Sequence, residues 1–193
     1  MRAIEVAVSI PAALIAGLLA AVSSVNGELL LALQIPMTTL LLVPVYVGGE
    51  FSILLLVLMF TSILVPIVEE TGKAFGYILP LLGFRSRFNL SFAFLLGALS
   101  GFSFGVIENF IYANALSGLS PEKYAAIMWF RWIACLPLHM ISTGVGCLCL
   151  AYILEKLGLR EPNALALFMG LMPAYVIHGT YNLIVSLFPP VGI

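Results

Sequence analysis

Long apolar runs, separated by short polar segments, make up most of the chain. Runs at 4–22, 29–47, 90–115 and 164–188 are each near or above the roughly 20 residues that a helix needs to cross a bilayer. Turn-prone Ser, Asn and Gly residues at 23–27 separate the first run from the second. The pattern predicts an all-α, polytopic bundle of transmembrane helices.

Two further runs are longer than one crossing requires. The run at 51–82 has about 32 residues and contains Pro66, and the run at 121–154 contains Pro137. Proline removes a backbone donor and bends a helix, so each is the expected position of a kink. The second of these runs is either one kinked helix or an interfacial piece followed by a span. We therefore expect about six spans, with seven as the alternative, and long kinked third and fifth helices.

Composition points to the same class of protein. The 193 residues are 62% hydrophobic and 9% charged, whereas soluble domains contain roughly 25% charged residues. We expect a multi-pass integral membrane protein of the plasma membrane, with a single transmembrane domain over 1–193 and a catalytic core at about 51–188. The formal net charge of -1 gives no indication of a nucleic-acid partner.

The three cysteines, Cys135, Cys147 and Cys149, all lie in apolar runs. They show no CxxC spacing, and none has a partner cysteine in a loop. We therefore expect buried thiols rather than disulfides or metal ligands.

Three charged residues interrupt the apolar run at 51–82. Glu69, Glu70 and Lys73 lie within five positions of one another. An ion in the hydrocarbon core costs about 2.5 to 3.5 kcal/mol on insertion scales, so these side chains must face protein, water or each other. Charged residues at such depth mark a candidate functional site.

Four more ionisable residues lie in the other long runs: Glu108, Arg131, His139 and His178. Glu108, His139 and His178 each fall about 20 to 28 Å along their helices from one end, at 1.5 Å per residue, which is near the midplane for tilted helices. Thr143 and Asn182 follow the two histidines at i+4, so each pair shares a helix face.

Structural explanations exist for individual members of this set. A single histidine in a membrane helix can be bonded to a neighbouring helix as part of the packing, and Glu70 with Lys73, or Glu108 with Arg131, can be structural ion pairs. Several costly groups at matching depth on four helices favour a site, because apolar residues would pack those helices without a desolvation cost.

A stripe of small residues lies on the run at 90–115. Gly97, Gly101 and Gly105 recur every fourth residue, which allows a second helix to approach closely. We interpret this stripe as a packing surface rather than as part of the chemistry.

Several protease mechanisms are excluded by what the sequence lacks. The chain contains no Asp, so it cannot be a paired-aspartate protease, and it contains no HExxH motif. Ser120 lies in a Gly-x-Ser context and is followed by Pro121 in a predicted loop, which disfavours Ser120 as a buried nucleophile. A glutamate that activates water, assisted by histidines, remains.

These residues together resemble a known family. Four blocks occur in order: Glu69-Glu70-x-x-Lys73, Phe104-x-x-x-Glu108-Asn109, Arg131 with His139-x-x-x-Thr143, and His178-x-x-x-Asn182. They resemble the motifs of the PrsW family of intramembrane proteases, which is similar in turn to the CAAX prenyl protease and bacteriocin-processing membrane proteins. A lone EExxK would be weak evidence, but the four blocks cover roughly 65–182 at the expected spacing.

The first helix of the predicted site supplies the base. We assign Glu69 as the general base that activates water, and Glu70 as its structural or charge-pairing neighbour, because consecutive residues are about 100° apart on a helix. The opposite assignment of the two glutamates stays open. Lys73 and Arg131 are expected to balance charge, Arg131 by pairing with a glutamate.

Side chains on the other helices of the predicted site are expected to bind the attacking water and the oxyanion. Glu108 and His139 are expected to hold and orient the attacking water, and His178 and Asn182 to donate to the oxyanion. A second chemistry uses His139, His178 and Glu108 as the ligands of a catalytic zinc ion, with Glu69 as the base.

The resemblance implies a membrane-anchored protein or peptide as substrate, such as an anti-sigma factor. No residue of the chain identifies that substrate, and the oligomeric state is left open. Two other functions use the same buried charges: a proton-coupled membrane protein, and a catalytically silent protein that binds transmembrane partners.

Overall fold

The computed structural model describes residues 3–34, 58–84 and 88–188, and helices dominate all three ranges. The elements are α1 (Ala3–Gln34), the π-helical segment η1 (Phe60–Leu64), α4 (Val65–Phe84), α5 (Leu90–Ala115), α6 (Pro121–Phe130), the π-helical segment η2 (Arg131–Cys135), α7 (Leu136–Lys156) and α8 (Ala164–Leu187). No strand occurs among these residues, which confirms the all-α prediction.

Within the described ranges, four helical stretches are long and apolar enough to cross a membrane: 3–22, 90–115, 121–156 and 164–187. They coincide closely with the apolar runs of the sequence, and a membrane bundle is confirmed. The second predicted span, 29–47, lies mostly outside the described residues.

The predicted end of the first helix is wrong. Helix α1 continues through the Ser, Asn and Gly residues at 23–27 and ends at Gln34. Such residues cost at most about 1 kcal/mol each in a helix interior, which is too little to stop a helix whose surroundings favour it.

The helix is irregular at both positions predicted as kinks, and each has the same construction. A π-helical segment ends two residues before Pro66 in one helix and two residues before Pro137 in the other. The N–H of Val65 bonds to the carbonyl of Phe60, five residues back, and Leu136 bonds to Arg131 in the same way. Proline has no N–H to donate to the preceding turn. The widened turn shifts the backbone hydrogen bonds from four residues back to five residues back just before this missing donor. Residues 121–156 therefore form one continuous helical stretch with a π-helical turn before Pro137.

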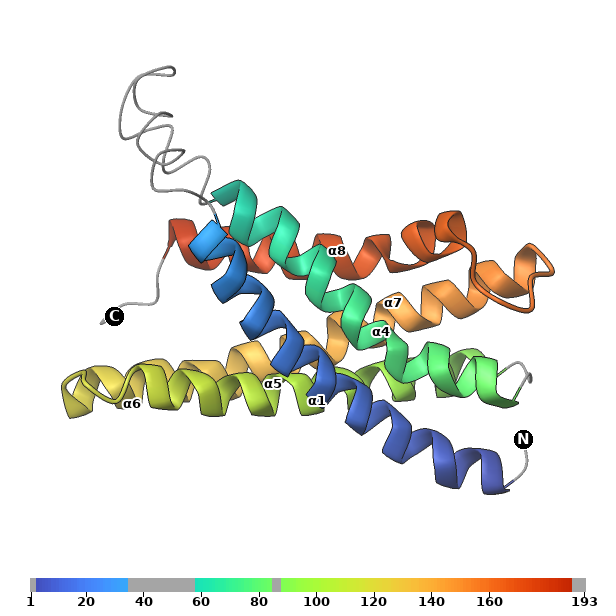
Figure 1. Cartoon of the computed structure of the whole chain (residues 1–193), viewed down its shortest axis with the longest axis horizontal. Helices are drawn as coiled ribbons and strands as arrows, with labels where there is room; N and C mark the ends of the chain where they lie inside the picture. Colours follow the sequence, from blue (N-terminus) through green and yellow to red (C-terminus); the bar gives the residue numbers. More distant parts are fainter. Residues whose placement is uncertain (1–2, 35–57, 85–87, 189–193) are drawn as a thin grey trace, which may run out of the picture.

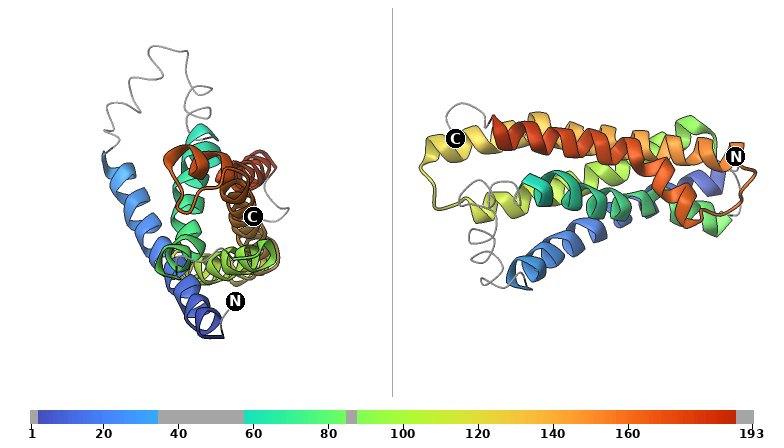
Figure 2. Two further views of the ribbon diagram at one scale, coloured as in Figure 1. Left: turned by 90° about the vertical axis from the view of Figure 1, so that its right-hand side faces the viewer. Right: turned by 90° about the horizontal axis from the view of Figure 1, so that it is seen from above.

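The helices form a bundle with two directions of packing. Helices α5, α7 and α8 run roughly along the long axis of the molecule, whereas α1 and α4 lie side by side and cross α5 at an angle (Figure 1). Seen from above, α8 lies along α7 (Figure 2). The larger apolar core lies between α1, α4, α5, α7 and α8, and Tyr77, Leu96, Leu150 and Leu171 are among its fully buried members.

The glycine stripe of α5 packs against α7, as expected. A Cβ atom on Gly97 would contact the backbone carbonyl of Thr143, and a Cβ atom on Gly101 would overlap the carbonyl of His139. Gly105 lies against Leu136 and the ring of His139. The stripe therefore sets the distance between α5 and the part of α7 that carries His139.

Substitution of Gly101 by Ala is expected to destabilise the bundle. The new methyl group overlaps backbone atoms of α7, which cannot rotate away, and overpacking of this kind costs about 1–3 kcal/mol. Thermal unfolding of the purified protein in detergent should show a lower midpoint. Gly83→Ala is the matched control, because a Cβ atom there meets nothing within 4 Å, and its midpoint should equal or exceed that of the wild type. Equal midpoints for the two variants would contradict the packing role of Gly101.

Candidate active site

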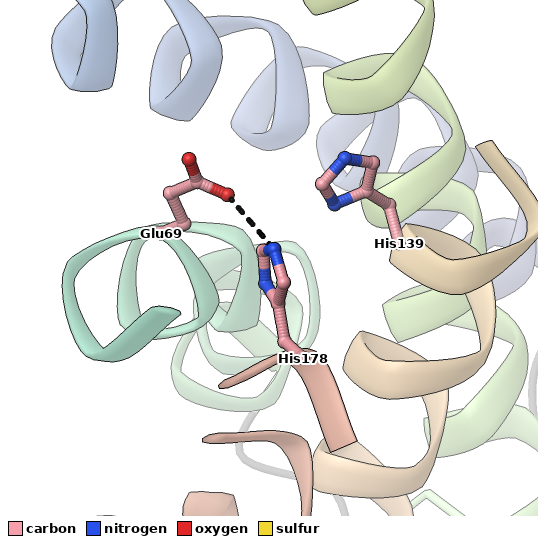
Figure 3. Close-up of side chains that lie close together, drawn as sticks. All are labelled: Glu69, His139 and His178. Carbon is pink, nitrogen blue, oxygen red and sulfur yellow. Dashed lines mark ion pairs between the residues drawn. The ribbon is translucent and has the colours of Figure 1, made fainter. Parts of the chain in front are cut away.

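Three helices direct polar side chains into one space. Glu69 on α4, His139 on α7 and His178 on α8 point toward one another (Figure 3). Each follows a proline on its own helix: Pro66 precedes Glu69 by three residues, and the other two prolines lie two and five residues before the histidines. The structure thus brings together residues that are far apart in the sequence.

Glu70 is completely buried and is held by four donors. Its Oε1 atom accepts hydrogen bonds from Lys73 at 2.7 Å, from Ser142 at 3.0 Å and from His178 Nδ1 at 2.8 Å. Its Oε2 atom accepts from Thr143 at 2.6 Å. A carboxylate that accepts from four donors on three helices is an ionised structural anchor, so it has little capacity left to react with water.

Glu69 differs from Glu70 in its surroundings. Its Oε2 atom lies 3.3 Å from Lys73 Nζ and 3.8 Å from His178 Nε2. Glu69 lines a cavity, whereas Glu70 does not. The divergence of adjacent residues around a helix therefore separates the two glutamates as expected, with Glu69 on the accessible side.

The ring of His139 bridges a cation and an anion. Its Nε2 atom lies 2.8 Å from Glu108 Oε2, and its Nδ1 atom lies 3.0 Å from Lys73 Nζ. An ionised carboxylate only accepts and an ammonium only donates, so the neutral ring carries its proton on Nε2. The Lys73 ammonium also lies 4.1 Å from the centre of the Phe104 ring, which packs against His139.

Arg131 pairs with a glutamate, as the sequence predicted. Its Nη2 atom lies 2.7 Å from Glu108 Oε2, and its Nε–H donates to Asn109 Oδ1 at 3.0 Å. The guanidinium also lies 3.5 Å from the centre of the Tyr112 ring. Arg131 thereby fixes Glu108, which in turn fixes His139.

The cavity beside Glu69 has a volume of about 390 Å³ and reaches from the two histidines to Leu116, in the turn after α5. Its polar lining consists of Thr61, Glu69, Glu108, Tyr112, Arg131, Cys135, His139, His178, Tyr181, Asn182 and Ser186. All the predicted site residues except Glu70 and Lys73 line it.

Comparison with known proteins identifies the family of this chain. Residues 7–193 match the family described as PrsW family intramembrane metalloprotease. The chain belongs to the PrsW family. No curated protein and no solved structure shows a significant match to the chain. The PrsW match covers nearly the full sequence, so this is an integral membrane protease whose substrates are membrane proteins.

A candidate metal site in this PrsW chain differs in one ligand from the predicted set. Ligand atoms of Glu69, His139 and His178 all lie within 4.8 Å of one another. Glu69 thus takes the place expected for Glu108, whose Oε2 atom bonds to His139 and Arg131.

The donor chemistry of this cluster fits a divalent ion such as zinc. Two imidazoles and one carboxylate are a common catalytic zinc set. Glu70 holds Nδ1 of His178, as carboxylates do for metal-bound histidines, and Nε2 is left to face Glu69. His139 would have to exchange its contact with Lys73 for the ion. The cluster contains three carboxylates, those of Glu69, Glu70 and Glu108. The cations that pair with them are Lys73 and Arg131, so one negative charge remains to be balanced.

Two further residues of the site, Ser142 and Tyr181, were not predicted from the sequence. Ser142 donates to Glu70, and its position three residues after His139 on a helix was the available indication. Tyr181 lines the cavity with its hydroxyl 2.9 Å from Cys135 Sγ, and its position three residues after His178 is the corresponding indication. Cys135 and Cys147 are buried free thiols, as predicted, and Cys149 is half-buried and also free.

Replacement of Glu70 by Gln is expected to destabilise the PrsW protein more than the same change at Glu69. Glu70→Gln leaves the buried Lys73 without its closest anion, and removal of one partner from a buried ion pair costs about 3–5 kcal/mol. Thermal unfolding in detergent should show a clearly lower midpoint for Glu70→Gln than for Glu69→Gln. A larger loss for Glu69→Gln would contradict the assignment of Glu70 as the anchor.

Proposed function

We propose that this protein hydrolyses a peptide bond of a membrane-anchored protein or peptide, and that Glu69 is the general base. The observation that carries the proposal is the convergence of Glu69, His139 and His178 on a polar cavity among transmembrane helices. Polar side chains at this depth allow water to reach a peptide bond that lipid otherwise shields.

The tautomer of His178 defines where water can bind. Nδ1 of His178 donates to the ionised Glu70, so the neutral ring presents a lone pair on Nε2. That atom and Glu69 Oε2 are then two acceptors 3.8 Å apart. A water molecule placed against both donates one hydrogen to each, which orients its oxygen toward a substrate carbonyl.

The reaction requires the transfer of one proton. Glu69 takes a proton from the attacking water as the oxygen bonds to the carbonyl carbon, and the same proton later passes to the leaving amine as the C–N bond breaks. Lys73, at 3.3 Å, stabilises the carboxylate before the transfer. His139 and Glu108 border the cavity and hold Lys73 and Arg131 in position.

Oxyanion stabilisation is assigned to Asn182. Its side-chain amide lines the cavity and carries two N–H groups, one of which bonds to the carbonyl of Thr61 at 2.9 Å. We assign the other N–H to the oxyanion. His178 can donate to the oxyanion only when its Nε2 atom is protonated. The neutral ring therefore does not have the donor role expected from the sequence.

Replacement of Glu69 by Gln is expected to abolish cleavage and to preserve the fold, because Gln keeps the size of the side chain and removes the base. Loss of a general base lowers the rate by about 10²–10⁴-fold. The measurement is the appearance of fragments from single-span reporter proteins that are reconstituted with the enzyme in vesicles.

Glu122→Gln is the matched control for this experiment, because Glu122 is exposed on α6 and does not line the cavity. It should cleave as the wild type does. Equal cleavage by Glu69→Gln would overturn Glu69 as the base. No cleavage of any reporter by the wild type would favour a protein that binds membrane partners without cutting them.

A zinc-dependent form of the same protease is the second candidate, and the cluster of Glu69, His139 and His178 favours it. These three residues would hold the ion, and Glu108 would be the carboxylate left at the cavity. A bound zinc ion lowers the pKa of water and polarises the substrate carbonyl.

Metal content separates the two forms. If zinc is bound, purified wild-type protein should carry about one equivalent, as catalytic zinc sites do, and His178→Ala should lose most of it. Elemental analysis measures this directly, with Glu122→Gln as the control that retains the metal. Full cleavage by a metal-free preparation would remove the zinc form and leave Glu69 as the base.

A further inference from the structure

Tyr181 reaches across the cavity one helical turn from the reacting centre. It follows His178 by three residues on α8, and Cys135, the last residue of η2, precedes His139 by four. The phenol oxygen lies 2.9 Å from Cys135 Sγ, and both residues line the cavity. The contact therefore joins the same two helical stretches as the facing histidine rings, whose centres are 5.0 Å apart.

The direction of the phenol is fixed by its packing. The ring of Tyr181 stacks on the ring of Phe130, with centres 6.4 Å apart and an angle of 12° between the two planes. Phe130 also lines the cavity. The stacked ring therefore keeps the hydroxyl group at the cavity rather than in the surrounding lipid.

The thiol that this hydroxyl contacts is a poor hydrogen-bond partner. Sulfur is a weak acceptor, and the S–H group is a weak donor. An oxyanion accepts hydrogen bonds that are shorter and about twice as strong as those between neutral groups. Exchange of Cys135 for an oxyanion as the partner of Tyr181 is therefore favourable.

The oxyanion of the proposed reaction has so far a single donor, one N–H of Asn182. The neutral ring of His178 presents a lone pair instead of a donor. Arg131, the cation of the described cavity lining, is bonded to Glu108 and to Asn109. Oxyanion holes commonly combine several donors, and a tyrosine hydroxyl is among the groups that they use.

We propose that Tyr181 is a catalytic residue, the second donor to the oxyanion beside Asn182. When the water oxygen bonds to the carbonyl carbon, the C=O electron pair moves onto the carbonyl oxygen and a water proton passes to Glu69. The Tyr181 hydroxyl leaves Cys135, donates a hydrogen bond to this oxygen and keeps its own proton. As the C–N bond breaks, the C=O bond forms again, Glu69 gives its proton to the amine, and the hydroxyl returns to the thiol.

Helix geometry places the two donors on either side of the proposed water position. At about 100° per residue, Tyr181 lies about 60° to one side of His178 and Asn182 about 40° to the other, both one turn further along α8. Nε2 of His178 and Oε2 of Glu69 are the acceptors proposed to orient the water. A carbonyl group attacked there has its oxygen within reach of the next turn of α8. The inference rests on the proposed function, because the oxyanion arises only if a peptide bond is hydrolysed.

Tyr181→Phe keeps the ring and its stacking on Phe130 and removes only the hydroxyl. Loss of one oxyanion donor should lower kcat for a single-span reporter in vesicles by about 10²–10³-fold. The KM should stay within about twofold of the wild-type value, because the donor acts on charge that develops after the substrate has bound.

Cys135→Ala is the matched control, because it breaks the same hydrogen bond and leaves the hydroxyl in place. It should keep kcat within about threefold of the wild-type value, and its thermal midpoint measures what the bond contributes to stability. Ser186→Ala removes a hydroxyl from another part of the cavity lining and should leave kcat unchanged.

A transition-state analogue gives a readout that a purely structural contact would not move. A peptide phosphonate with the sequence of the reporter presents a tetrahedral anion, so Tyr181→Phe should weaken its binding by about the same factor as it lowers kcat/KM. Uncleaved reporter should bind equally well to Glu69→Gln with and without Tyr181→Phe.

Three outcomes would contradict the role of Tyr181. Full cleavage by Tyr181→Phe, with Glu69→Gln inactive, would remove this inference and leave the proposed function in place. Equal losses of cleavage in Tyr181→Phe and Cys135→Ala would reduce the contact to a structural one. Phosphonate binding that does not change in Tyr181→Phe would exclude the oxyanion as the partner. No cleavage by the wild type would remove the proposed function and this inference with it.

Discussion

The buried pair of Glu70 and Lys73 is the interaction on which the site depends. Removal of two ions from water costs several kcal/mol each, and the loss is recovered only if both are fully bonded. Glu70 accepts from residues of α4, α7 and α8, and Lys73 contacts Glu69, His139 and the Phe104 ring of α5. The pair therefore ties four helices together at one depth and fixes the tautomers of both histidines.

Prolines give this arrangement its shape. Pro66 and Pro137 each follow a π-helical segment, and both segments contribute residues to the cavity. A regular helix satisfies its own backbone, whereas a widened turn before proline leaves carbonyl groups that must find other donors. The bond from Asn182 to Thr61 is one such solution, and it lies at the edge of the cavity.

Much of the fold followed from the sequence because bilayer thickness imposes a simple rule on apolar length. The runs at 90–115 and 164–188 matched α5 and α8 almost residue for residue, and the helix is irregular at both prolines where a kink was predicted. The end of α1 was not, since Ser, Asn and Gly are weak signals whose effect a helix in a bundle overrides. Ser142 and Tyr181 were missed because many small polar residues occur in such helices and only contact distinguishes them.

The sequence by itself determined which residues are candidates for the chemistry: ionisable groups are so costly in a bilayer that their presence in apolar helices is informative wherever they fall. Only the tertiary structure decided how these candidates are arranged around the cavity. It enclosed Glu70 among four donors and turned Glu69 toward the cavity, and it grouped Glu69 rather than Glu108 with the two histidines. Such roles depend on the rotation and crossing of neighbouring helices, and a linear spacing of residues does not contain that geometry.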